Sequence, residues 1–406
     1  MSSVYVARQP IFELNRGLYG YELLYRRDAN IDRADGETGA MSAEVIVDAL
    51  LGIGLRAIAG GSVAFVNFSE AQLISETWAL FDPSEVVIEL LESIQATEET
   101  LTACRKMVAA GYRLALDDYV HTEDNRALLE FATIAKIDVL GRTEDDIASV
   151  ARMLKPLGIR LLAERVETAT MRDACVRMGF EFFQGYLFSK PETLTKSDVA
   201  PGQLAIMRLL NLLNDPATPD QTLDQAFQSD LALSYKLLRI VNAASMGGRG
   251  GVTSIPHAIR LIGRSALHRW LSVVLVASMG KRGDVTHELA LTSITRARMC
   301  ELLAANARTS RPTGSAFLVG LLSLLDVLFQ VPMDKILSHI ELSDEVTSAL
   351  TKRGGPLGTP LKLVESYEQA DWDGAQQLAE ASDVPEEILG NLYIDSLHWA
   401  AQHVAV

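Results

Sequence analysis

Two adjacent carboxylates follow a short apolar run in the first half of the chain. Leu114 to Leu116 read as a buried strand, and Asp117 and Asp118 come directly after it. Neighbouring carboxylates repel each other unless their charge is compensated, and in proteins a divalent cation commonly compensates it. The competing interpretation is an ordinary turn or a helix N-cap made of Asp, which an isolated pair would favour.

The same pattern recurs in the first half of the chain, and the recurrence favours a metal site over a turn or helix cap. Other short apolar runs of the first half also end in polar residues, namely Glu22, Asn67, Glu89, Lys136, Glu164 and Gln184. Helix caps and turns do not explain so many strand ends that carry side chains of the metal-ligand type. Carboxylates and an Asn oxygen are hard ligands, which suit Mg²⁺ or Mn²⁺ better than zinc.

These residues predict a two-metal phosphodiester site. A shared Asp can bridge two ions, and two ions can activate a water and stabilise the leaving oxygen of a phosphodiester. A lysine beside them, here Lys136, would position that water or neutralise charge.

The elements that must hold these residues alternate between strand and helix. Apolar runs begin at Val4, Leu18 and Val63 and recur as far as Phe183, and helical patterns cover 43–55, 97–110, 143–157 and 168–178. About eight such repeats in about 190 residues predict a TIM-like (β/α)₈ barrel, an α/β fold whose strand ends converge on one mouth. An open doubly wound sheet is the alternative, but it would not gather polar residues from nearly every strand.

Composition sets outer limits on the function. The 406 residues exceed the usual size of one core, which predicts two domains, and the formal net charge of −15 argues against a nucleic-acid partner. The N-terminus is too polar for a signal peptide, so we expect no leader. The longest apolar stretch, Phe317 to Phe329, is too short to span a bilayer and reads as one buried helix, so we expect no membrane partner. The three scattered cysteines favour a reducing, cytoplasmic setting.

The first half resembles the EAL-type cyclic di-GMP phosphodiesterases over roughly residues 4–192. The resemblance is carried by Glu22-Leu23-Leu24 with Arg26, Val66-Asn67-Phe68-Ser69, Glu89 with Glu92, Asp117-Asp118, Lys136-Ile137-Asp138, Glu164 with Glu167, and Gln184-Gly185-Tyr186. It implies cyclic di-GMP as the ligand and a two-metal site for Mg²⁺ or Mn²⁺, with Ca²⁺ as an inhibitory substitute.

The same resemblance implies a role for each matching residue. Glu22, Asn67, Glu89 and Asp117 would bind one metal, and Asp117 with Asp118 would bind the second. Glu22, Lys136 and Glu164 would be catalytic, with Lys136 and Glu164 positioning the attacking water. Ligand contacts would come from Arg26, Gln184 and Asp138, and a loop over the site would be anchored by Glu92 and Glu167.

Two departures from the family pattern concern the support of the site. After Asp118 the family usually has a Gly-rich loop, whereas this chain reads Tyr119-Val120-His121-Thr122-Glu123-Asp124-Asn125 without glycine. Arg165 stands where the family has a glycine, and its cation would either block the mouth or pair with a ligand phosphate. The chain keeps the residues expected to bind metal and ligand but changes the segments that support them. This combination suits a weak enzyme or a receptor that binds the dinucleotide without hydrolysing it.

The second half reads as an all-α domain. Helical spacing of apolar residues recurs from Leu204 to Ala401, and a Pro- and Gly-containing stretch precedes it. The run 229–244 and the run 255–263 resemble the HDOD domain, a relative of the HD phosphohydrolases. The chain has no His-Asp dipeptide, so we expect a non-catalytic domain that binds an unknown protein partner.

The sequence thus predicts a barrel domain over 1–192, a linker over 193–202 and a helical HDOD domain over 203–406. Three functional hypotheses stay open: a cyclic di-GMP receptor, an active phosphodiesterase that yields the linear dinucleotide pGpG, and a ligand-free interaction scaffold. A homodimer is possible, because family barrels often pair near the altered loop.

Overall fold

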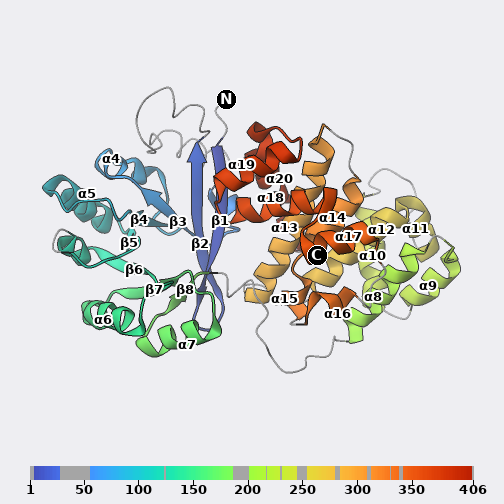
Figure 1. Ribbon diagram of the computed structural model, residues 1–406, viewed down its shortest axis with the longest axis horizontal. Helices are drawn as coiled ribbons and strands as arrows, with labels where there is room; N and C mark the ends of the chain where they lie inside the picture. Colours follow the sequence, from blue (N-terminus) through green and yellow to red (C-terminus); the bar gives the residue numbers. More distant parts are fainter. Residues whose placement is uncertain are drawn as a thin grey trace.

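The computed structural model describes residues 4–27, 55–122, 125–185, 201–215, 217–228, 231–244, 254–278, 284–308, 312–329, 331–337 and 342–404. A strand-and-helix part and a wholly helical part lie side by side, and β1 and β2 run along the line between them (Figure 1). In the described residues, no helix is both long and apolar enough to cross a bilayer.

The first part is a closed barrel in the strand order β1-β2-β3-β4-β5-β6-β7-β8. Its strands are β1 (Val4–Glu13), β2 (Leu18–Arg27), β3 (Val63–Phe68), β4 (Val86–Leu90), β5 (Arg113–Leu116), β6 (Ala132–Asp138), β7 (Arg160–Glu164) and β8 (Phe182–Phe183). The predicted barrel is therefore confirmed, with one correction: β1 is antiparallel to both β2 and β8. A hairpin joins β1 to β2, because residues 14–17 are too few for a helical crossover.

Alternation along the strands explains how the barrel is filled. Side chains at every second position point inward and form a separate buried cluster of Ile11, Phe65, Val87, Ala115, Ile134, Leu162 and Phe182. The intervening positions face the surrounding helices. The polar strand ends predicted from the sequence continue the inward-facing rows, so their side chains converge above this apolar floor.

The helices of this part cover the outside of the barrel. They are α3 (Leu55–Ile58), α4 (Glu70–Ile74), η1 (Thr77–Leu80), α5 (Glu98–Ala109), η2 (Arg126–Glu130), α6 (Glu144–Leu154), η3 (Lys155–Leu157) and α7 (Ala169–Met178). Thr97, Thr143 and Thr168 accept backbone N–H bonds at the starts of α5, α6 and α7, which agrees with the predicted helix starts. A helix expected over Ala43 to Leu55 lies almost entirely outside the described residues.

The second part is helical throughout its described residues, as predicted. It comprises α8 (Pro201–Asn214), α9 (Asp220–Gln228), α10 (Leu231–Ala244), α11 (Ile255–Ile262), α12 (Arg264–Ala277), α13 (Val285–Asn306), α14 (Thr313–Leu322), α15 (Leu325–Phe329), α16 (Met333–Leu337), α17 (Asp344–Lys352), α18 (Gly355–Glu368), α19 (Trp372–Ala381), η5 (Glu386–Ile388) and α20 (Leu389–Val404).

One expectation for this part needs correction. Residues 317–329 do not form one helix, because α14 ends at Leu322 and a new helix, α15, starts at Leu325. Pro201 and Gly202 lie in the first turn of α8, where proline is tolerated. The domain boundary, with a linker over 193–202, stays a prediction.

The β1–β2 hairpin connects the two parts through specific polar contacts. The Tyr5 hydroxyl donates to Glu386 Oε1 at 2.9 Å, and the backbone N–H of Val6 donates to the Tyr367 hydroxyl at 3.3 Å. The Tyr21 hydroxyl donates to Glu288 on α13, and both of these side chains are buried. The hairpin therefore forms part of the barrel wall and also the surface against which the helical part packs.

Candidate functional site

A fully buried ammonium group lies at the centre of the barrel mouth. Lys136 Nζ, on β6, is 2.7 Å from Asp117 Oδ1 and 3.0 Å from one carboxylate oxygen each of Glu22, Glu89 and Glu164. Glu22 lies within β2, whereas Glu89, Asp117 and Glu164 lie at or just after the ends of β4, β5 and β7, and all four meet around one cation. The prediction that these polar residues converge is confirmed.

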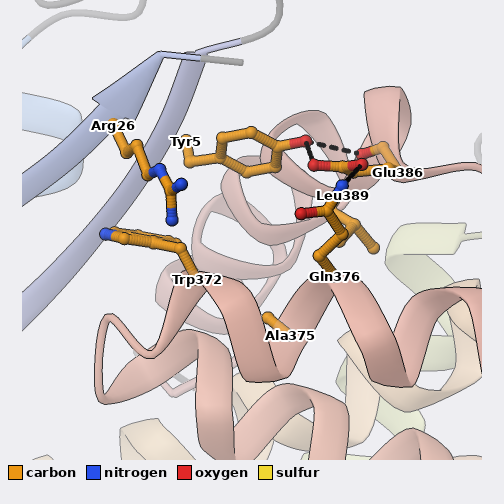
Figure 2. A pocket seen from close by; sticks show the side chains of 7 residues that line it. All are labelled: Tyr5, Arg26, Trp372, Ala375, Gln376, Glu386 and Leu389. Carbon is orange, nitrogen blue, oxygen red and sulfur yellow. Dashed lines mark hydrogen bonds between the residues drawn. The ribbon is translucent and has the colours of Figure 1, made fainter. Parts of the chain in front are cut away.

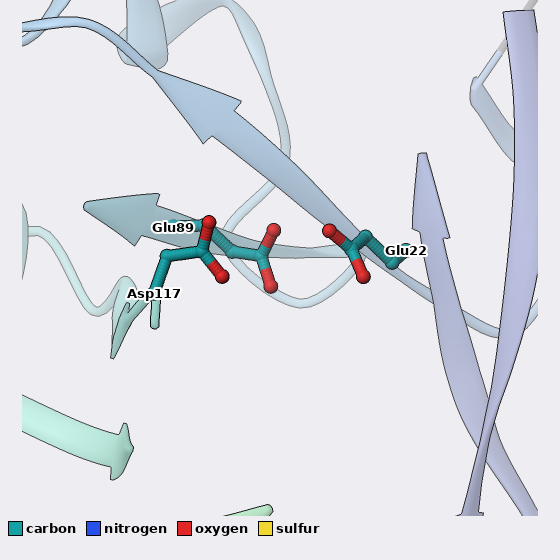
Figure 3. Close-up of side chains that lie close together, drawn as sticks. All are labelled: Glu22, Glu89 and Asp117. Atoms are coloured by element: carbon teal, nitrogen blue, oxygen red, sulfur yellow. The ribbon is translucent and has the colours of Figure 1, made fainter. Parts of the chain in front are cut away.

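The cluster carries more negative charge and more oxygen ligands than one lysine satisfies. Buried side-chain oxygens of Asn67, Glu89, Glu164 and Gln184 have no hydrogen-bond partner. Glu89 Oε1 lies within ion-pair distance of Lys136, but the angle is too poor for a hydrogen bond, so its charge is only partly met. Glu22, Glu89 and Asp117 each place one oxygen within 4.8 Å of the others, and Figure 3 shows their carboxylates turned toward one another.

This donor set fits a hard divalent cation. Buried carboxylate and amide oxygens without partners cost free energy, and an oxygen-preferring ion such as Mg²⁺ or Mn²⁺ would satisfy them. Glu22, Asn67, Glu89 and Asp117 are the residues in place to hold it. Asp118 is exposed and has a positive φ of 42°, and it lies outside the three-carboxylate group, so its role at a second metal stays a prediction.

Hydrogen bonds from Gln184 and Tyr25 hold Glu22 and the backbone of Asn67 in place. Gln184 Nε2 donates to Glu22 Oε2 at 2.7 Å and to Gln9 Oε1 at 2.9 Å. The Tyr25 hydroxyl donates to the backbone carbonyl of Asn67. Gln9 and Tyr25 were not predicted as site residues. Gln9 lies opposite Glu22 in the β1–β2 pairing. A prediction of the β1–β2 hairpin would therefore have placed Gln9 at the site.

The pKa values of the acidic residues diverge. Burial raises the pKa of Glu89 well above its ordinary value, and the charges of Glu22 and Asp117 add to this effect. Burial, again with help from Glu22 and Asp117, raises the pKa of Glu164 to about 7. Burial also acts on Glu22, but the charge of Lys136 and hydrogen bonds from Gln184, Lys136 and Asn67 outweigh it and lower the pKa.

Arg165 has a backbone conformation that suits glycine better than arginine. Arg165 has a φ of 52°, in the left-handed region that glycine adopts most readily, and its guanidinium pairs with Asp138. Asp138 also accepts the backbone N–H of Leu140 at 2.9 Å. The cation therefore neutralises a residue that was predicted to contact the ligand. Whether Asp138 contacts the ligand stays a prediction.

A pocket of about 630 Å³ joins the cluster to the helical part. Its barrel wall includes Glu22, Glu164, Arg165, Glu167 and Gln184, and its opposite wall includes Glu288, Thr292, Arg296 and Glu368 from α13 and α18. The volume is in the range of small-molecule sites. The sequence did not predict this helical wall, because only the packing of the two parts brings α13 and α18 to the barrel mouth.

Several predicted residues are not among the described residues that line this pocket, and Arg26 and Glu92 are two of them. Arg26 pairs with Asp373 Oδ1 on α19 at 2.8 Å and lines a small separate pocket with Tyr5 and Trp372 (Figure 2). Glu92 is exposed in the segment after β4, and its role as a loop anchor stays a prediction. Glu167 is exposed at the pocket rim, and its anchoring role likewise stays a prediction.

Comparisons with known proteins place both parts in named families. The EAL domain family matches residues 62–191, and the HDOD domain family matches residues 203–339. The cyclic di-GMP phosphodiesterase CdgJ of Vibrio cholerae serotype O1 is 33% identical, over 96% of this chain and 91% of its own length. The chain belongs to the EAL–HDOD family.

A second relative of this EAL–HDOD protein covers it equally well. The uncharacterized protein YuxH of Bacillus subtilis (strain 168) is 32% identical over 98% of both chains. Among solved structures, the PaMucR phosphodiesterase in complex with c-di-GMP is 20% identical, covering 46% of this chain and 95% of its own, with a TM-score of 0.39. The membership in the family rests on the two full-length relatives.

Proposed function

We propose that this EAL–HDOD protein is a cyclic di-GMP signalling protein whose barrel binds the dinucleotide with divalent metal ions. The observation that carries the proposal is the set of buried, unpartnered oxygens around Lys136, which a bound divalent cation would satisfy. A metal bound there would supply that charge and hold a phosphodiester oxygen of the ligand. Mg²⁺ and Mn²⁺ fit this role, and Ca²⁺ would bind as a non-activating substitute.

The helical domain would carry the output. It forms one wall of the pocket beside the cluster, so the state of the barrel mouth bears directly on α13 and α18. The partner of this domain would be another protein. All three cysteines are free and buried, which supports a cytoplasmic location, where thiols stay reduced.

A thermal-shift measurement tests the binding proposal. Cyclic di-GMP with Mn²⁺ should raise the melting temperature of the wild-type protein and leave that of Glu22→Ala unchanged. Glu130→Ala, which removes an exposed carboxylate of η2, is the matched control and should respond like the wild type. Equal shifts in Glu22→Ala and the control would place the ligand elsewhere.

Hydrolysis is the second candidate function, and the environment of Glu164 favours it. A carboxyl group with a pKa of about 7 is suited to accept a proton from water near neutral pH. Lys136, beside it, would hold that water and stabilise negative charge on the phosphate. Water would add across one P–O ester bond of the ring, which gives the linear dinucleotide with one new terminal phosphate and one free hydroxyl.

Chromatography of the reaction mixture separates the two candidates. An enzyme should convert cyclic di-GMP to the linear product with Mn²⁺ present, and Glu164→Gln should retain binding while losing at least about 100-fold in rate. A receptor should bind without forming product in either protein. Neither binding nor product would leave an interaction scaffold with an inherited carboxylate cluster.

A further inference from the structure

Arg26, which the family resemblance implies as a ligand contact, is held by the helical domain. It is the penultimate residue of β2, four residues after Glu22, and its Nη1 lies 2.8 Å from Asp373 Oδ1 in the first turn of α19. Figure 2 shows Arg26 beside Trp372, close to the Tyr5 and Glu386 side chains that join the domains. The larger pocket, which contains Glu22 and Glu164, does not include Arg26 among its described lining residues.

The ion pair with Asp373 occupies the Arg26 guanidinium, the group that would bind a phosphate of the ligand. A guanidinium that pairs with a carboxylate has given up part of the donor surface that binds phosphate. The side chains of Arg26 and Asp373 are 35% and 76% exposed, so their ion pair is weak enough for a ligand to displace. Asp373 is not needed to start its helix, because the N-cap of α19 is Asp371.

We propose that Asp373 is a positioning residue that withholds Arg26 from the ligand while the helical domain is docked. This inference rests on the proposed binding of cyclic di-GMP at the barrel mouth. Binding would draw Arg26 from Asp373 to a ligand phosphate and so loosen the contact between α19 and the hairpin. By thermodynamic linkage, a partner that pulls α19 away from β2 would tighten ligand binding by the same factor.

A double-mutant cycle in the full-length protein tests this coupling. The affinity for cyclic di-GMP is measured by calorimetry with Ca²⁺, which avoids turnover, for the wild type and for Asp373→Asn, Arg26→Ala and the double variant. Glu380→Gln removes one exposed charge from the last turn of the same helix and is the matched control. Asp373→Glu keeps the charge and should resemble the wild type.

The expected result is specific to Arg26. Asp373→Asn should tighten binding about twofold to fivefold, the range expected for an exposed ion pair, and Glu380→Gln should not. Arg26→Ala should weaken binding, and in that background Asp373→Asn should have no further effect. Equal affinities for Asp373→Asn and Glu380→Gln would overturn the inference and leave the proposed function intact. A lack of binding by every protein, wild type included, would overturn both.

Discussion

At the scale of single residues, the site is a cluster of acidic side chains that outnumber their one basic partner, Lys136. One ammonium is shared by four carboxylates, and it has no exposure to solvent. The pKa of Lys136 is raised well above its ordinary value, because the four surrounding carboxylates outweigh the effect of burial. The lysine therefore stays charged at neutral pH and holds the cluster together when no metal is bound.

Removal of this charge should destabilise the metal-free barrel. Lys136→Met keeps the length of the side chain but leaves the buried carboxylates without a counter-charge, at a cost of about 3–5 kcal/mol. Thermal unfolding in EDTA measures the loss, and saturating Mn²⁺ should recover more stability in the variant than in the wild type. An unchanged melting temperature in EDTA would mean that the carboxylates are already protonated or solvated.

The raised carboxyl pKa values predict how the stability of the metal-free protein depends on pH. The pKa of Glu164 is about 7 in the fold against 4.5 for the free group, so unfolding releases protons between these values and stability falls as pH rises through that window. The raised pKa of Glu89 acts in the same direction. The stability that comes from the lowered pKa of Glu22 is lost only at more acidic pH, as pH falls from about 4.5 through the folded value.

Melting temperatures in EDTA should therefore decline from pH 5 to pH 8, and Glu164→Gln should flatten the decline. With Mn²⁺ present the trend should weaken or reverse, because metal and protons compete for the same oxygens. A metal-free protein whose stability rises over this range would contradict the assigned directions.

The residue types and their spacing were enough to predict the cluster. Glu22, Glu89, Asp117, Lys136 and Glu164 all follow short apolar runs, and strand ends in a barrel must converge. The placement of Arg26 could not be predicted, because its partner Asp373 comes from another domain more than 300 residues away. Sequence patterns carry no information about which helix docks against that strand end.

At the scale of elements, close backbone approaches fix where the ligating side chains point. Gly185 follows Gln184 with a φ of 143°, and a Cβ atom there would lie 2.3 Å from the backbone nitrogen of Val166. The Val166 N–H donates to the Gln184 carbonyl at 3.0 Å. The strand end that carries Gln184 is thus pressed against the segment after β7.

Gly185→Ala should disrupt this approach. The clash and the unfavourable φ together should cost about 2–5 kcal/mol, and displacement of Gln184 from Glu22 should weaken Mn²⁺ binding. Gly158→Ala is the control, since Gly158 has a φ of 76° with no atom within 4 Å of the added Cβ, and it should cost only about 1 kcal/mol. Urea unfolding measures both variants. Equal costs would show that the φ angle alone matters.

Element prediction succeeded where periodicity was strong and failed at a turn. Strands and helices from Val63 to Phe183 follow the predicted alternation. The β1–β2 hairpin was missed although Asn15 and Gly17 are turn residues, because the expected βα repeat overrode that local signal. The break between α14 and α15 was missed because continuous apolar sequence, including Leu324 and Leu325, hides a helix end.

At the scale of the whole molecule, the β1–β2 hairpin belongs to both domains. Gln9 and Glu22 reach the site, while Tyr5, the backbone N–H of Val6 and Tyr21 contact the helical part. A shift of the helical domain would therefore act on the same two strands that hold the ligand site. The β1–β2 hairpin could therefore transmit a change at the ligand site to the helical domain through direct contacts.

A double-mutant cycle across the domain boundary tests this arrangement. Tyr21→Phe and Glu288→Ala each remove one partner of a buried hydrogen bond, so their effects on unfolding free energy should be non-additive by at least about 1 kcal/mol. Tyr21→Phe combined with Glu301→Ala, farther along α13, should be additive. Additivity in the first pair would mean that α13 does not dock on β2 in solution.

The most direct test of the central claim is a calorimetric titration of the full-length protein with cyclic di-GMP, with Mn²⁺ and with EDTA. The carboxylate cluster at the barrel mouth predicts saturable binding of one dinucleotide per barrel with Mn²⁺, and a large loss of affinity in EDTA and in Glu89→Gln. Binding of equal strength without metal, or no binding with it, would contradict the account.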